Sequence, residues 1–276
     1  MDRYALIGHP VEHSKSPLIH AAFARQTRQK LSYRALLAPL DGFSDTVQMF
    51  RKEGGHGANI TVPFKIEACS LATRLTERAR LAGAVNTLTF VNDAVVGDNT
   101  DGIGLVRDLI VNLACPLAGR HVLLLGAGGA ARGVLFPLFQ TKPVSLTVVN
   151  RTVERAQELR AAFAPYAGQT AFTAGGFQDL DGWEFDVVIN ATSASLENET
   201  LPLPNSIFAP NAFAYDMMYG DTPFLAWARS AGVTQLSDGL GMLVEQAAES
   251  FALWRGVRPK SARVLRELRE KSASNG

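Results

Sequence analysis

The chain has 276 residues, which is long enough for two domains that each bury a hydrophobic core. Its 27 basic and 26 acidic residues leave a formal net charge of +1, so no global field favours nucleic acid or an anionic membrane as a partner. No apolar run reaches the roughly 18 residues that a membrane span needs. We therefore expect a cytoplasmic protein with no nucleic-acid or membrane partner.

Cysteine and histidine give no sign of a metal or disulfide framework. The two cysteines, Cys69 and Cys115, are too few for a knuckle or a set of bridges, and we interpret them as buried filler. The five histidines do not have metal-ligand spacing. No metal site is expected.

Strand and helix patterns alternate in the first part of the chain. Ser16 is predicted to be the N-cap of a helix, with Pro17 in its first turn. A hairpin is expected to turn at Asn92–Asp93. The predicted strands cover residues 4–8, 31–38 and 57–61, and the predicted helices cover 16–26 and 41–51.

The stretch "NITVPFK", residues 59–65, alternates apolar with polar side chains and predicts a strand with one polar face. Pro63 should end this strand and begin a helix, where its missing N–H costs nothing. Lys65 would then lie in the first helical turn, near the positive end of the helix dipole. Such a lysine is suited to proton transfer. The alternative is a solvated surface lysine.

Further polar side chains occur where strands end or helices begin. Hydroxyls, amides and a carboxylate of this kind suit a polyhydroxylated acid as ligand. The alternative is that Ser16 and Asp101 are helix caps and that Asn86 is a turn residue, which does not exclude a binding role. The residues in question are Ser14, Ser16, Asn86, Asn99 and Asp101.

The rest of the chain has the doubly wound pattern of a parallel sheet with helices on both faces. A helix begins near Asp101, and the nearly unbroken apolar run 121–125 is typical of a strand buried on both faces. We predict an α/β protein. Further strands are expected at 145–150, 186–190, 212–217 and 233–237, and closing helices at 242–254 and 261–271.

The sequence "GAGGAA", residues 126–131, directly follows this buried strand and opens a helix. In such a fingerprint Gly126 makes the tight turn, Gly128 lets the backbone approach a pyrophosphate, and Ala131 permits close helix packing. The free N–H groups of the helix N-terminus would bind the phosphates. An ordinary tight turn is the alternative, but strand, loop and helix occur in the required order.

The end of the next strand favours NADP over NAD. An NAD site usually has an acidic residue there, whereas this chain has Asn150 followed by Arg151 and, further on, Arg155. Guanidinium groups pair with a 2′-phosphate that a carboxylate would repel. The alternative is that Thr152 caps a helix and both arginines are solvated.

These motifs together resemble the shikimate dehydrogenase family. The resemblance extends from Tyr4 to about Gly256 and is specific because the motifs occur in order and at the right spacing. It is carried by "HSKSP", "NITVPFK", "AVNTL", "GDNTDGIG", "GAGGAARGV", "NRT", "NATS" and "DGLGMLVEQAAESF".

The resemblance implies the reversible reduction of 3-dehydroshikimate to shikimate by NADPH, on the route to chorismate and the aromatic amino acids. It implies Lys65 and Asp101 as the catalytic pair. The implied substrate-binding residues are Ser14, Ser16, Asn59, Thr61, Asn86, Asp101, Tyr219 and Gln246. The implied cofactor-binding residues are Gly126, Ala127, Gly128, Gly129, Ala130, Asn150, Arg151, Thr152, Arg155, Met217 and Gly239, with Glu77 as an addition.

Two other functions remain open at this point. A related enzyme would oxidise quinate as well as shikimate and accept NAD, and a nucleotide-sensing module would have lost catalysis. The expected architecture is an N-terminal α/β substrate-binding domain with a mostly parallel sheet (1–102), a Rossmann-type NADP-binding domain (103–238) and C-terminal helices that return to the first domain (239–276). The active site is expected in the cleft between the domains. The chain is expected to be a monomer or a homodimer.

Overall fold

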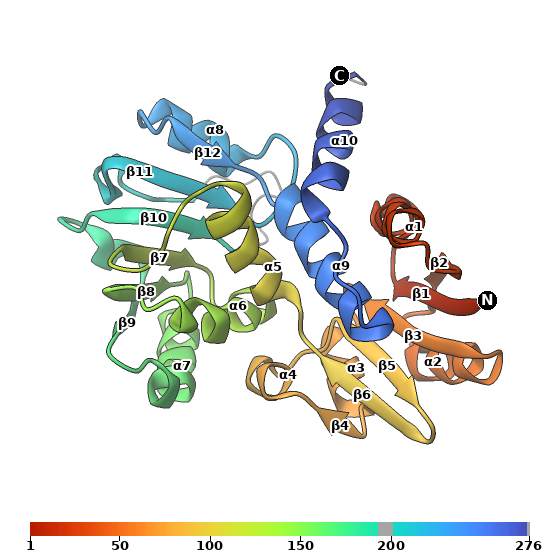
Figure 1. Ribbon diagram of the computed structural model, residues 1–276. Helices are drawn as coiled ribbons and strands as arrows, with labels where there is room; N and C mark the ends of the chain where they lie inside the picture. The colour runs from red at the N-terminus through yellow and green to blue at the C-terminus, as the bar shows by residue number, and fades with distance from the viewer. Residues whose placement is uncertain (193–200, 275–276) are drawn as a thin grey trace. The chain divides into compact units, whose positions relative to one another are not determined.

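The computed structural model describes residues 1–192 and 201–274 (Figure 1). The fold divides into two compact units. Unit 1 comprises Met1–Gly104 together with Leu243–Gly276, and unit 2 comprises Leu105–Met242. The domain limits expected from the sequence (1–102, 103–238 and 239–276) remain a prediction.

Unit 1 contains a six-stranded sheet in the order β2-β1-β3-β5-β6-β4. The pairs β1–β2, β1–β3 and β4–β6 are parallel, and the pairs β3–β5 and β5–β6 are antiparallel, which agrees with the mostly parallel sheet predicted. The strands are β1 (Asp2–Gly8), β2 (Leu31–Leu37), β3 (Gly55–Ile60), β4 (Arg74–Leu75), β5 (Thr87–Val91) and β6 (Ala94–Asp98). The helices are α1 (Ser16–Thr27), α2 (Phe43–Lys52), α3 (Lys65–Leu71), α4 (Glu77–Ala82), α9 (Leu240–Arg255), which begins in unit 2, and α10 (Ser261–Ser274).

Unit 2 contains a six-stranded sheet that is parallel throughout, in the order β12-β11-β10-β7-β8-β9 (Figure 1). Numbered from its own first strand, this order is 6-5-4-1-2-3, the order of a Rossmann fold. The strands are β7 (His121–Leu125), β8 (Ser145–Val149), β9 (Ala171–Gly175), β10 (Phe185–Asn190), β11 (Phe208–Asp216) and β12 (Gln235–Ser237). The α-helices are α5 (Asp101–Arg107), which begins in unit 1, α6 (Gly129–Gln140), α7 (Val153–Phe163) and α8 (Pro223–Ser230).

Each unit has its own apolar core, because the buried strands supply side chains on the faces that the helices cover. Ile7, Ile60 and Leu88 are buried in unit 1, and Leu123 and Val188 are buried in unit 2. The predicted α/β fold is confirmed. So is the hairpin at Asn92–Asp93, since Val91 pairs with Ala94.

Three local predictions are wrong. Ser16 is not a cap: Lys15 occupies the N-cap position without a side-chain bond, and the Ser14 hydroxyl accepts from the Ser16 N–H (3.2 Å). Pro63 lies in a turn before α3, which begins only at Lys65. Val62 is exposed because the strand has already ended at Ile60, so the alternation of apolar residues in the sequence continues beyond the end of the strand.

The two thiols are free, with different burial. Cys115 is buried, as predicted, whereas Cys69 is only partly buried. Burial raises the pKa of both thiols, which keeps them protonated and unreactive near neutral pH.

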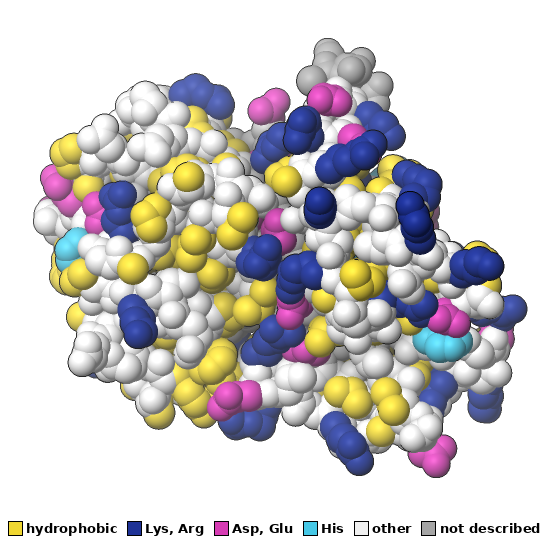
Figure 2. Space-filling view, in the orientation of Figure 1, with side chains coloured by type: hydrophobic (Ala, Val, Ile, Leu, Met, Phe, Trp, Pro, Cys, Tyr) yellow, Lys and Arg dark blue, Asp and Glu magenta, His cyan; other side chains and the backbone are white. Residues whose placement is uncertain are grey.

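The surface carries both signs of charge. In the view of Figure 2, Lys and Arg side chains gather over α1, α9 and α10, with Asp and Glu side chains among them. Within residues 1–192 and 201–274, no helix combines the length and the hydropathy that crossing a bilayer requires.

Candidate functional site

The polar side chains singled out in unit 1 share one edge of its sheet. The strands β1, β3 and β6 run in the same direction and end there, and β5 runs the opposite way and begins there. Ser14 and Ser16 follow β1, whereas Asn59 and Thr61 lie at the end of β3. Asn86 precedes β5 and Asp101 follows β6, so both also lie at this edge.

Lys65 and Asp101 form an ion pair at this edge. The Lys65 Nζ lies 2.6 Å from Asp101 Oδ2, and the two side chains are 32% and 11% exposed. Both residues begin helices, α3 and α5. The amine is therefore accessible to a ligand while its partner is largely buried.

Asn86 holds the other oxygen of the same carboxylate. Its Nδ2 donates to Asp101 Oδ1 (2.8 Å) and to Thr100 Oγ1 (2.9 Å), and it approaches Gln246 Oε1 (3.4 Å). Its own Oδ1 accepts from the Thr100 N–H (2.9 Å). Because Asn86 is only 3% exposed, these bonds fix the direction in which Asp101 faces Lys65.

Asn59 is the centre of a second buried set of hydrogen bonds. Its Nδ2 donates to Ser250 Oγ (2.9 Å) and Thr87 Oγ1 (3.1 Å), and also lies 3.2 Å from the Asn86 carbonyl oxygen. Its Oδ1 accepts from the Tyr33 hydroxyl (2.8 Å). The network joins β2, β3, β5 and α9, so it ties the end of the chain to the polar edge of the sheet.

Two members of this region, Tyr33 and His20, were missed by sequence reasoning. Their rings stack with centroids 4.1 Å apart and planes 6° apart. Burial raises the pKa of Tyr33 well above its usual value, with an opposing influence from the Ser16 hydroxyl. Burial lowers the pKa of His20 to about 3, and Asn59 opposes this shift to a smaller extent. No local sequence signal marks either residue, because their partners are far along the chain.

The remaining predicted substrate residues of unit 1 are placed by their elements. Ser16 is buried and Ser14 is half-buried at the start of α1. The Thr61 N–H donates to the Ile7 carbonyl (3.0 Å), which fixes the chain after β3. Gln246 lies on α9, four residues before Ser250, and its Nε2 donates to the Leu243 carbonyl (2.9 Å).

The glycine loop of unit 2 lies between β7 and α6. Gly126 has a φ of +103°, and a Cβ there would lie 3.1–3.2 Å from Thr192 and Ala191. By contrast, a Cβ on Gly128 or Gly129 would meet nothing within 4 Å. Gly126 is thus required by the turn itself, whereas Gly128 and Gly129 leave open space beside the N-terminus of α6, as a bound pyrophosphate needs.

Asn150 occupies the end of β8, where an NAD site usually has an acidic residue. Its Oδ1 accepts from the Ala127 N–H (3.3 Å) and its Nδ2 donates to the Thr152 carbonyl (2.9 Å). Thr152 is the N-cap of α7 but its side chain makes no cap bond. Arg151 and Arg155 are exposed, and neither guanidinium forms a hydrogen bond or ion pair within the described part of the chain. Both are available for a 2′-phosphate.

Met217 and Gly239 lie close together at the carboxyl edge of the same sheet. A Cβ on Gly239 would lie 2.1 Å from the Met217 carbonyl oxygen, so only glycine allows this approach. Tyr219, which is 40% exposed, also belongs to unit 2. Glu77 is exposed at the start of α4 in unit 1, and is thus not in the unit that carries the glycine loop.

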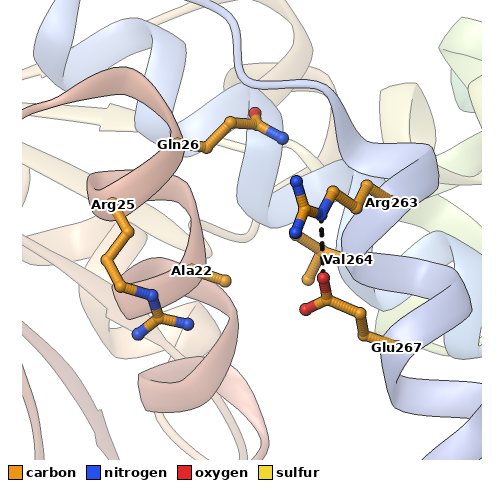
Figure 3. Close-up of a pocket in the computed structure, with 6 residues that line it drawn as sticks. All are labelled: Ala22, Arg25, Gln26, Arg263, Val264 and Glu267. Carbon is orange, nitrogen blue, oxygen red and sulfur yellow. Dashed lines mark hydrogen bonds and ion pairs between the residues drawn. The ribbon is translucent and has the colours of Figure 1, made fainter.

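A pocket of about 310 Å³ opens between α1 and α10 (Figure 3). None of the predicted site residues lines it. Its walls carry Arg25 and Gln26 from α1 and an Arg263–Glu267 ion pair (2.9 Å) from α10. Arg263 is 77% exposed at its side chain, so the pair is a solvated surface pair rather than part of a catalytic centre.

A Rossmann sheet with an open glycine loop, together with a lysine–carboxylate pair at the polar edge of a second sheet, defines a dinucleotide-dependent oxidoreductase. Three family models match the chain: shikimate dehydrogenase substrate binding domain (residues 6–88), shikimate/quinate 5-dehydrogenase (109–199) and shikimate 5′-dehydrogenase C-terminal domain (239–269). The chain belongs to the shikimate dehydrogenase family. The serine of the "NATS" motif, Ser193, lies outside the described residues.

Individual relatives agree with this family. The chain is 64% identical to the shikimate dehydrogenase (NADP(+)) of Aromatoleum aromaticum, over 98% of this chain and 97% of that one. It is 49% identical to an Ael1 enzyme from Pseudomonas putida (TM-score 0.92, covering 97% and 98%). It is 32% identical to the shikimate 5-dehydrogenase of Thermus thermophilus, solved in complex with NADP(H) and shikimate (TM-score 0.85, covering 98% and 99%).

Proposed function

We propose that this chain catalyses the reversible reduction of 3-dehydroshikimate to shikimate with NADPH, a step on the route to chorismate and the aromatic amino acids. The observation that carries the proposal is the Lys65–Asp101 pair, 2.6 Å long and only partly exposed. The names of the relatives support the substrate and the cofactor.

Lys65 is the proposed proton donor. Reduction of a ketone places negative charge on its oxygen, and an ammonium beside that oxygen stabilises the charge and delivers the proton. In the oxidative direction the same amine accepts the proton. Asp101 orients the amine, and the Asn86 amide keeps its carboxylate in place.

The substrate is proposed to bind through the polar edge of the unit 1 sheet. Ser14, Ser16 and Thr61 supply hydroxyl donors for a carboxylate, since each hydroxyl gives one hydrogen bond to an anion. Asn59, Asn86, Asp101 and Gln246 lie around the hydroxyl-binding end, and the internal bonds of Asn59 and Asn86 make them rigid parts of the wall. Tyr219 is proposed as a further contact.

NADP(H) fits the residues of unit 2 and, when bound, supplies or accepts the hydride. Gly126–Ala130 would hold the pyrophosphate, because the Cβ positions of Gly128 and Gly129 face open space. Asn150, Arg151, Thr152 and Arg155 would hold the adenosine 2′-phosphate. Met217 and Gly239 are proposed at the nicotinamide end, and Glu77 is the least supported of the cofactor residues because it lies in unit 1.

Initial rates followed at 340 nm test the proposal against its nearest competitor, a quinate-oxidising enzyme that accepts NAD. We expect shikimate with NADP to give the highest kcat/KM of the four pairings of shikimate or quinate with NADP or NAD. Comparable rates with quinate and NAD would favour the broader enzyme. No turnover in any pairing would favour a nucleotide-sensing module.

Replacement of Lys65 tests the chemical step. Lys65→Ala should lower kcat by about 10²-fold or more and change KM for shikimate much less, because general acid catalysis contributes about 10²–10⁴-fold. Lys52→Ala is the matched control, an exposed lysine at the end of α2 in the same unit. A Lys65→Ala protein with near-normal kcat would remove the lysine from catalysis.

A cytoplasmic location and a monomeric or homodimeric state also remain predictions. Sedimentation of the purified protein and fractionation of cells that produce it would test them.

A further inference from the structure

We propose that Arg78 is a positioning residue. Through Asp98 it fixes the position of Asp101, and through Glu249 it fixes the position of Gln246. The inference rests on the proposed function, because it takes Asp101 as catalytic and Gln246 as a substrate contact. Arg78 itself touches neither Lys65 nor the expected substrate residues in any hydrogen bond or ion pair recorded for the described residues.

The guanidinium of Arg78 donates two parallel hydrogen bonds to the Asp98 carboxylate. Its Nε lies 2.6 Å from Asp98 Oδ1 and its Nη2 lies 2.7 Å from Asp98 Oδ2. The side chains are 19% and 7% exposed. Thr76 Oγ1, from the N-cap of α4, also donates to Asp98 Oδ1 (2.7 Å). The Asp98 carboxylate is thus held by the charge and the two parallel N–H bonds of the Arg78 guanidinium, and by the Thr76 hydroxyl.

Asp98 in turn shapes the segment that carries Asp101. The Asn99 N–H donates to Asp98 Oδ1 (2.7 Å), and the Asn99 Nδ2 donates to the Ala84 carbonyl (3.0 Å). The Asn99 Oδ1 accepts from the Asp101 N–H (3.1 Å). A continuous set of hydrogen bonds therefore runs from Arg78 to the backbone of Asp101, at the first residue of α5.

A further bond from the same guanidinium reaches α9. Arg78 Nη2 lies 3.2 Å from Glu249 Oε1, and Glu249, whose side chain is 15% exposed, also pairs with Arg258. Glu249 is three residues after Gln246 and one before Ser250 on the helix. One side chain on α4 therefore joins the end of β6 to the helix that supplies Gln246.

This role needs arginine rather than any cation. A planar guanidinium can bond two carboxylates in fixed directions at once, whereas a lysine ammonium is a point charge on a flexible stem. Arg78→Lys keeps the charge beside Asp98, so the buried carboxylate is not left unpaired and the protein is expected to fold. The variant removes the fork and the simultaneous bond to Glu249.

The first experiment compares Arg78→Lys with wild type by steady-state kinetics. We expect kcat/KM for shikimate to fall about 10-fold, since charge-assisted hydrogen bonds are lost, while KM for NADP stays within about twofold. Arg263→Lys is the matched control, because its pair with Glu267 is a solvated pair on the same unit (Figure 3). A lowered melting temperature with unchanged kcat and KM would show a purely structural role and overturn the inference.

A double-mutant cycle separates positioning of Asp101 from general loosening. Asp101→Asn should lower kcat, and adding Arg78→Lys to it should cost much less than Arg78→Lys costs alone, because the carboxylate being positioned is already gone. Full additivity would overturn the inference. If Asp101→Asn kept the wild-type rate, the catalytic role of Asp101 would fail, and the inference with it. A slow Asp101→Asn beside a normal Arg78→Lys would overturn the inference alone.

Glu249→Gln keeps the inference testable even if Arg78→Lys does not fold. It removes the charge from the bond between Arg78 and α9 and from the pair of Glu249 with Arg258, and it leaves the Arg78–Asp98 fork intact. We expect KM for shikimate to rise about threefold with kcat nearly unchanged, since Gln246 is a proposed binding residue rather than a chemical one. An unchanged KM would overturn the part of the inference that concerns Gln246.

Discussion

At the scale of single residues, His20 is a buried base whose charge state depends on folding. It is 1% exposed, neither ring nitrogen has a hydrogen-bond partner among the described residues, and burial lowers its pKa to about 3 from the 6.5 of an unfolded chain. Between these values the unfolded chain binds a proton that the folded protein does not. The free energy of unfolding must therefore fall as the pH falls through this window.

We predict that His20→Phe removes this dependence. The phenyl ring can still stack on Tyr33 but cannot bind a proton. From about pH 6.5 to about pH 5, His20 should remove about 1.6 kcal/mol from the stability of the wild type, because the slope rises from about 0.7 kcal/mol per pH unit at the unfolded pKa toward about 1.4 kcal/mol per pH unit below it. Urea unfolding at the two pH values measures the difference. His13→Gln, at an exposed histidine, should keep the wild-type dependence; an equal loss of stability in His20→Phe would refute the assignment.

A second prediction at this scale concerns cofactor choice. Arg151→Gln should raise KM for NADP about 10- to 100-fold and leave KM for NAD nearly unchanged, because only NADP has the 2′-phosphate that the guanidinium can bond. Arg229→Gln, at an exposed arginine on α8 of the same unit, is the control. If both cofactors weakened equally in Arg151→Gln, Arg151 would not read the 2′-phosphate.

From the sequence alone, functional side chains could be identified where the adjacent residues form a recognisable motif. Lys65 and Asp101 each lie in a polar motif at the start of a helix, and the structure brings them to 2.6 Å. Arg78 gave no such signal, since its partners Asp98 and Glu249 are 20 and 171 positions away. In the sequence it is one of two arginines in "ERAR", residues 77–80, where no helix or motif was predicted. Contacts of this kind depend on the tertiary fold.

At the scale of elements, the glycines of the loop between β7 and α6 are needed for different reasons, one for the turn itself and one for the space beside the loop. Gly126→Ala should destabilise the protein by about 1–3 kcal/mol, because a positive φ and a crowded Cβ both oppose alanine. Gly128→Ala should leave stability nearly unchanged but raise KM for NADP about 10-fold or more, because its Cβ would occupy the space proposed for the pyrophosphate. Thermal unfolding without cofactor, set beside KM for NADP, measures the contrast. Equal melting points for the two variants would contradict it.

Elements were predictable where the hydrophobic pattern was strong. The apolar run of β7 and the hairpin pattern around Asn92–Asp93 gave the right strands, β7, β5 and β6. The two-residue β4, the short α4 and β9 were missed, because each is too short or too polar for a periodic signal. The N-cap of α1 was misassigned to Ser16, because serine is a residue type that caps helices. In the structure Ser16 is the first residue of the helix, and the Ser14 hydroxyl accepts the Ser16 N–H.

At the scale of the whole molecule, unit 1 is completed by the end of the chain. Trp254 of α9 stacks on Tyr4 of β1 (4.5 Å) and donates to the Leu88 carbonyl (3.1 Å), and Ser250 completes the bonds of Asn59. We predict that a chain ending at Met242 loses shikimate binding but keeps NADP binding. Calorimetric titration with each ligand tests this, with the full chain as reference. Shikimate binding by the shortened chain would contradict the role given to α9.

The same arrangement sets an order of events during synthesis on the ribosome. Every strand of the β7–β12 sheet is translated before α9, whereas β1–β6 must wait through all of that time for α9 and α10. The nascent chain therefore holds an incomplete hydrophobic surface at its N-terminal end for most of its elongation, and this is the surface that a ribosome-associated chaperone would meet first.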